Sequence, residues 1–158
     1  MPVNDPVRQQ LVNFLRGGHA HVTFEDAVEG FPVSKAGVRP GALPHSGWEL
    51  LEHIRISQND ILRFSQSADY VSPKWPEGYW PSEPAPAGAQ QWERSVDSFY
   101  RDRAAFEAMI VDPRQDLNKP FPWGDGQTLL REALLIIDHN AYHIGQLVML
   151  RRALGAWG

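Results

Sequence analysis

Two histidines, His139 and His143, lie four residues apart near the end of the chain, inside an apolar-periodic stretch at about residues 127–154. A spacing of four in a helix with 3.6 residues per turn places both imidazoles on one face, one turn apart. Such a pair can supply two ligands to one transition-metal ion. Asn140 stands where the metalloprotease motif His-Glu-x-x-His has its glutamate, so that motif is absent. The pair therefore indicates where chemistry could occur without identifying the reaction.

A third ligand must come from another element, because a catalytic site of this kind usually has three protein ligands and one open position. His53 is the best candidate, since it lies in the middle of a second predicted helix and between the apolar residues Leu50 and Ile54. Three imidazoles favour zinc, nickel, iron or copper over magnesium or calcium. The alternative is that these histidines are hydrogen-bonded core residues.

Other polar residues near these positions could have more than one role. Glu49, one turn before His53, either supports the metal site or caps the second helix. Gln146, about one turn after His143, could orient a ligand or a water molecule, and Tyr142 could line a pocket or merely pack. No general base is identified, so the catalytic residues are unknown. The remaining histidines, His19, His21 and His45, are expected at the surface.

The elements that must position these side chains are helices. Apolar periodicity and capping residues predict long helices at about residues 5–16, 46–68, 90–110 and 127–154, with a short one after Thr23. Connections rich in proline and glycine separate them, notably Tyr70–Gly88, whose aromatic residues line an entrance, anchor the loop or contact a second copy. Alternating strand patterns are missing. The sequence thus predicts an all-α four-helix bundle with long irregular connections.

Composition narrows the function further. The 158 residues fit a single domain spanning 1–158, and the 15 Lys and Arg against 19 Asp and Glu give a net charge of −4, which offers no basic footprint for nucleic acid. Cysteine is absent, so disulfides, zinc ribbons and thiolate nucleophiles are excluded. No signal peptide is evident, and no apolar run approaches the roughly 20 residues that span a bilayer. We expect a cytoplasmic protein with neither membrane nor nucleic-acid partners.

Three segments resemble a known family. Residues 44–54 (PHSGWELLEHI) are similar to the second-helix motif of the DinB-like superfamily, which includes the YfiT-type metal-dependent hydrolases. Residues 138–147 (DHNAYHIGQL), followed by 151–155 (RRALG), resemble its last-helix motif, and residues 19–27 resemble the N-terminal region of one subgroup. The resemblance covers nearly the whole chain.

This resemblance implies a four-helix bundle of up-down-down-up order, often a homodimer, with a divalent metal, most often zinc or nickel, held by His53, His139 and His143. Some relatives are transferases or isomerases that use low-molecular-weight thiols. The leading hypothesis is therefore a metal-dependent hydrolase or thiol S-transferase acting on a small molecule. The alternatives are a non-catalytic, dimerising metal- or ligand-binding stress-response module and a helical protein with three core histidines.

Overall fold

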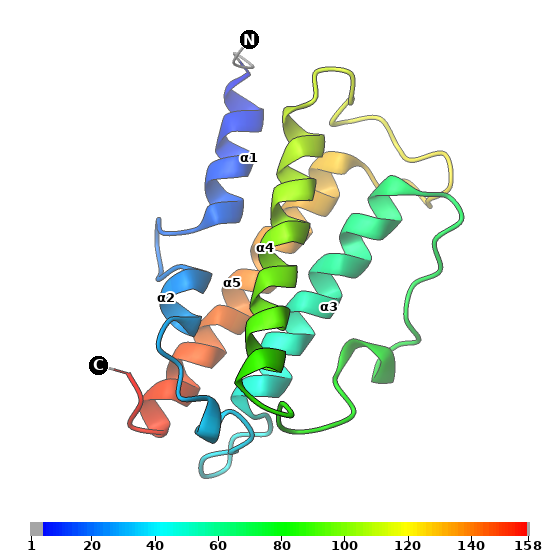
Figure 1. The fold of residues 1–158 in the computed structure, drawn as a ribbon. Helices are drawn as coiled ribbons and strands as arrows, with labels where there is room; N and C mark the ends of the chain where they lie inside the picture. Colours follow the sequence, from blue (N-terminus) through cyan, green and yellow to red (C-terminus); the bar gives the residue numbers. More distant parts are fainter. Residues whose placement is uncertain (1–4, 158) are drawn as a thin grey trace.

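The computed structural model describes residues 5–157, and this part of the chain is all-helical (Figure 1). Within it no helix is both long enough and apolar enough to cross a membrane. Five α-helices and two short 3-10 helices follow one another in the order α1 (Pro6–Arg16), α2 (Phe24–Val28), η1 (Val33–Lys35), α3 (Gly47–Gln66), η2 (Glu77–Tyr79), α4 (Ala89–Val111) and α5 (Leu129–Ala153).

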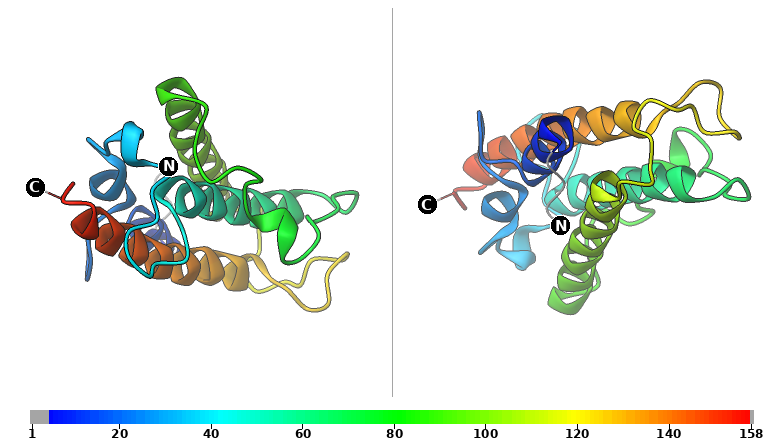
Figure 2. Two further views of the ribbon diagram at one scale, coloured as in Figure 1. Left: turned by 90° about the horizontal axis from the view of Figure 1, so that it is seen from below. Right: turned by 90° about the horizontal axis from the view of Figure 1, so that it is seen from above.

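Helices α1, α3, α4 and α5 form the four-helix bundle. In Figure 1, α1 and α5 run downward while α3 and α4 run upward, so the predicted up-down-down-up order is confirmed. Seen from below and from above in Figure 2, α3 and α5 lie side by side, and α3 also packs against α4. Parallel α3 and α4 are possible because the connection at residues 67–88 is long enough to return to the starting end of the bundle.

The helix ends follow the capping signals in the sequence. Ser46 and Glu49 form a reciprocal capping box at the start of α3, which fixes where this histidine-bearing helix begins. Thr128 caps α5, so this helix begins two residues later than the apolar pattern alone indicates. Gly17, with a φ of 78°, ends α1 in the left-handed region that glycine tolerates best.

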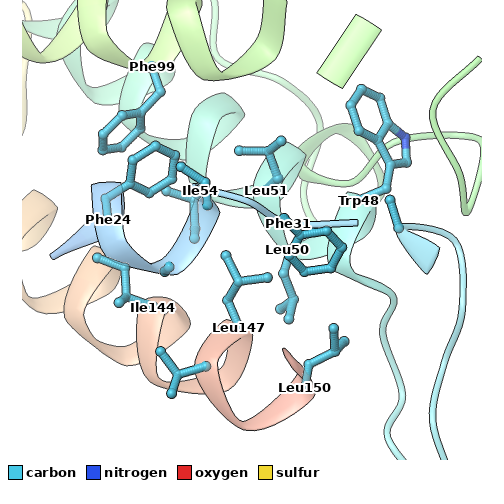
Figure 3. Close-up of a cluster of buried hydrophobic side chains, with 14 of the residues drawn as sticks. Phe24, Phe31, Trp48, Leu50, Leu51, Ile54, Phe99, Ile144, Leu147 and Leu150 are labelled. Carbon is cyan, nitrogen blue, oxygen red and sulfur yellow. The ribbon is translucent and has the colours of Figure 1, made fainter. Parts of the chain in front are cut away.

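The apolar core fixes how α3 and α5 are rotated about their axes. Leu51 and Ile54 of α3 and Leu147 of α5 have no exposed surface and pack in one cluster that includes residues of α2 and α4 (Figure 3). Burying each such side chain stabilises the fold by about 1.5–3 kcal/mol. Because His53 lies between Leu51 and Ile54 in the sequence, this packing determines the direction in which α3 presents it.

A buried polar chain ties three helices together beside this core. The Gln58 side chain on α3 donates from Nε2 to the backbone carbonyl of Phe99 on α4, at 2.9 Å. Its Oε1 accepts from Nδ2 of Asn140 on α5, at 3.0 Å. A buried amide left without partners costs about 1–3 kcal/mol, so this pairing favours one register of α3 against α5. Asn140 adjoins His139, so the same contact helps to fix the histidine helix.

The buried Arg151 joins the end of α5 to the region of α2. Its guanidinium donates to the backbone carbonyls of Asp26, Ala27 and Glu29 at 2.9–3.0 Å, and to that of Ala156. Asp26 and Ala27 belong to α2 and Glu29 is its C-cap, so these contacts occupy carbonyls that such a short helix leaves without helical partners. Arg151 therefore holds this short helix against the bundle.

Candidate metal centre

Three histidines from two helices meet in the groove between α3 and α5. His53 comes from α3, and His139 and His143 come from successive turns of α5. One ring nitrogen of each lies within 4.8 Å of the others, and Nε2 of His53 is 3.1 Å from Nε2 of His139. The structure thus brings together the three residues that the sequence singles out.

Hydrogen bonds to carbonyl oxygens orient two of the three rings. Nδ1–H of His53 donates to the backbone carbonyl of Tyr79 at 2.8 Å, and Nδ1–H of His143 donates to Oε1 of Gln146 at 2.7 Å. Since both acceptors are carbonyl oxygens, the proton of each ring lies on Nδ1 and the lone pair on Nε2. Such contacts fix the tautomer that a metal ligand needs. Nδ1 of His139 is buried without a hydrogen-bond partner, and its Nε2 faces His53.

These residues fit a transition-metal ion. Two nitrogens bound at 2.0–2.1 Å in tetrahedral geometry lie about 3.3 Å apart. The 3.1 Å between the Nε2 atoms of His53 and His139 is close to that separation. In residues 5–157 no Cys, Asp or Glu joins this group of three. The donor set is therefore that of a three-histidine site with room for further ligands.

The imidazoles are held neutral. Burial, reinforced by neighbouring His53, lowers the pKa of His139 to about 4, although Asn140 opposes the shift. Burial also lowers the pKa of His143 to about 4 against the opposing effect of its bond to Gln146, and it lowers the pKa of His53. Neutral imidazole is the form that binds metal, so near neutral pH little proton release has to accompany binding.

The η2 segment, residues 75–80, folds over the histidines. The Trp80 ring stacks on His53 with centroids 3.9 Å apart and on His45 with centroids 4.1 Å apart. The Tyr79 hydroxyl donates to Oδ2 of Asp60 at 2.7 Å; burial and this carboxylate raise the pKa of Tyr79 to about 12, so it stays a donor. Two side-chain contacts thus dock the segment on α3.

This arrangement differs from the sequence interpretation at one histidine. His45 is expected at the surface, but it is half-buried against Trp80, and burial lowers its pKa. The reason is the path of the 67–88 connection, which has no periodicity from which the stack could be predicted. His19 and His21 are exposed as expected, and His19 stacks on Phe14.

An open cavity of about 460 Å³ lies beside the three histidines, and we call it the histidine cavity. Its other walls include Ser57, Asp60, Asp138, Trp75 and Tyr79. Three roles were considered for the aromatic residues of the 70–88 loop. Trp75 and Tyr79 line the cavity entrance, and Trp80 anchors the loop by stacking on His53. A contact with a second copy stays a prediction.

The three residues considered as supports for the site have different environments. Glu49 forms part of the capping box of α3 and pairs with Arg39, so of its two considered roles it has that of a helix cap. Gln146 contacts His143 directly. Tyr142 is 66% exposed, packs edge-on against His143 with ring centroids 4.9 Å apart, and lines the histidine cavity. Gln146 and Tyr142 are thus next to the cluster.

Comparison with known proteins gives one result. Searches of curated proteins and of solved structures each found no match. A family model described as the DinB superfamily matches residues 18–147, well over half of the chain, and the matched range contains all three histidines. The all-helical bundle and its histidine cluster agree with this match. The chain belongs to the DinB superfamily.

Proposed function

We propose that this protein is a metal-dependent enzyme, a hydrolase or a thiol S-transferase, that acts on a small molecule. His53, His139 and His143 would hold one divalent ion, zinc or nickel. The observation that supports this most is the convergence of three imidazole nitrogens, within 4.8 Å of one another, beside an open cavity. Three protein ligands leave a position for water or substrate.

In this proposal, residues around the metal site have roles distinct from that of the metal ion. When bound, a divalent ion supplies Lewis acidity, which lowers the pKa of a water molecule or a thiol and polarises a carbonyl. The carbonyl of Tyr79 and the side chain of Gln146 hold two imidazoles in the ligating tautomer. Trp75 and Tyr142 border the open cavity, and Ser57 offers a polar contact to a substrate.

The metal is tested first. Protein purified without an affinity tag is analysed for bound metals, and we expect close to one divalent ion per chain in the wild type. The His139→Ala/His143→Ala variant should lose it, whereas the matched double variant His19→Ala/His21→Ala should keep it. Equal and negligible metal in wild type and the first variant would refute the proposal.

The reaction is tested on the metal-loaded protein. Ester and amide substrates probe hydrolysis, and electrophiles supplied with a low-molecular-weight thiol probe transfer. We expect turnover in one of these classes that disappears with the His139→Ala/His143→Ala variant. Persistent inactivity of metal-loaded protein in both classes would favour the alternative, a non-catalytic binding module.

We also propose that the protein forms a homodimer. Exposed apolar side chains, including Val7, Phe14 and Leu134, line an apolar groove of about 470 Å³ between α1 and α5. Contiguous exposed apolar surface of this kind is typical of protein contacts. Sedimentation of the wild type should show a dimer, and a Phe14→Glu variant should shift it toward monomer; a monomeric wild type at micromolar concentration would contradict the proposal.

A further inference from the structure

A second cavity lies in the same α3–α5 groove, next to the histidines. It has a volume of about 400 Å³, and we call it the apolar cavity. Cavities of roughly 300–1,000 Å³ hold small-molecule ligands. Apart from His45 and Gln146, its lining is apolar or aromatic and includes Leu43, Leu50, Tyr142 and Met149, and Gly145 also borders it.

The two cavities lie on opposite sides of the histidine cluster along the groove. Helices α3 and α5 are antiparallel, so residues before His53 on α3 lie beside residues after His143 on α5. Leu50 and Met149 therefore belong to the apolar side. Beyond the histidines, Ser57 and Asp60 of α3 belong to the side of the histidine cavity.

Two residues connect the apolar cavity to the cluster. Tyr142 lines both cavities. Gln146 lines the apolar cavity and also accepts the hydrogen bond from Nδ1 of His143. Tyr142 and Gln146 thus border both the histidine cluster and the apolar cavity, so the two sites are adjacent.

Gly145 keeps the wall of the apolar cavity free of a side chain. Glycine is less favourable than alanine in a helix interior, and Gly145 lies well inside α5. Packing does not require glycine here, because a Cβ built at this position would meet no atom within 4 Å. Gly145 is exposed and borders the cavity, so a large side chain at this position has room to extend over it.

We propose that the substrate is amphipathic, with its polar reacting group at the three histidines and an apolar arm in the apolar cavity. This inference rests on the proposed function and adds the substrate class. Met149 is 60% exposed and Leu43 is 38% exposed, so an apolar arm would remove their side chains from water. Each methylene buried in this way is worth about a fourfold gain in affinity at most.

Straight-chain hydroxamic acids test this directly, because the hydroxamate group chelates metal and the chain length can be varied. Calorimetry gives the dissociation constants of acetohydroxamate and octanohydroxamate for zinc-loaded protein. In the wild type we expect the affinity to rise about two- to fourfold per added methylene until the cavity is filled. In the Gly145→Leu variant the two dissociation constants should become nearly equal. Gly145→Ala adds only a small side chain, so octanohydroxamate should keep most of its advantage over acetohydroxamate.

The outcomes separate this inference from the proposed function. If the wild type takes up neither zinc nor nickel, the proposed function fails and this inference falls with it. If zinc and acetohydroxamate bind but affinity does not rise with chain length, or rises equally in Gly145→Leu, only the inference is overturned. Sedimentation is run in parallel: dissociation of a dimer by Gly145→Leu, with the ratio of the two dissociation constants unchanged, would assign the cavity to a second copy and overturn the inference.

Discussion

The hydroxyl of Tyr79 gives the sharpest single-atom test of how the site is held together. It donates to Asp60 at 2.7 Å, and the backbone carbonyl of the same residue accepts from His53 at 2.8 Å. Tyr79→Phe removes the first contact and leaves the second available. We expect the η2 segment to dock less firmly and His53 to lose part of its orientation.

The size of the effect follows from these contacts. A hydrogen bond to a charged group contributes about 1.5–3 kcal/mol, and the lower end applies because Tyr79 and Asp60 are only half-buried. If about 1.5 kcal/mol of this docking free energy is lost to metal binding, metal affinity falls about tenfold. That figure agrees with the 10–100-fold loss typical when a contact that orients a metal ligand is removed.

The assay is a competition titration of zinc against a chromophoric chelator. Tyr142→Phe is the matched control, because its ring also contacts a histidine of the cluster but its side chain is 66% exposed. We expect about a tenfold loss for Tyr79→Phe and less than twofold for Tyr142→Phe. Equal affinities for the two variants would show that the Tyr79–Asp60 contact does not support the site.

Three further predictions concern stability, each measured by urea unfolding. Arg151→Met should lower the free energy of unfolding by about 3 kcal/mol, because the carbonyls near α2 lose a charged donor. The exposed control Arg152→Met should change it by less than about 0.5 kcal/mol. Equal effects of the two variants would refute the role of Arg151. Burial lowers the pKa values of His139 and His143 to about 4 from 6.5, so between these values the unfolded chain binds more protons than the folded one. The metal-free protein should therefore be most stable above pH 6.5 and lose stability as pH falls toward 4; a His139→Gln/His143→Gln variant with the same pH slope would contradict this. Gly145→Ala should stabilise the protein by about 0.5–1 kcal/mol, since the new methyl group meets no atom within 4 Å; a destabilised variant would show that glycine is required there.

Local rules predict the helices and the histidine cluster well. The capping box of Ser46 and Glu49 marks the start of α3 within the sequence itself. A four-residue spacing places His139 and His143 on one face of α5, and the apolar neighbours of His53 turn it toward the bundle interior. These features are predictable because helix geometry and burial depend on residues close in sequence.

The surroundings of the cluster were not predictable in the same way. Tyr79, Trp80 and His45 meet the site through the irregular 67–88 connection, whose path is set by tertiary contacts. The pairing of Gln58 with Asn140 depends on the register between two helices far apart in the chain. The two cavities depend on both, so their lining could be recognised only in three dimensions.

X-ray absorption spectroscopy of the zinc-loaded protein tests the central claim most directly. For the wild type the account predicts one zinc ion with three imidazole nitrogens at about 2.0–2.1 Å. The His53→Ala variant should show at most two imidazoles or retain no zinc. A zinc environment without imidazole, or one that is the same with and without His53, would contradict the account.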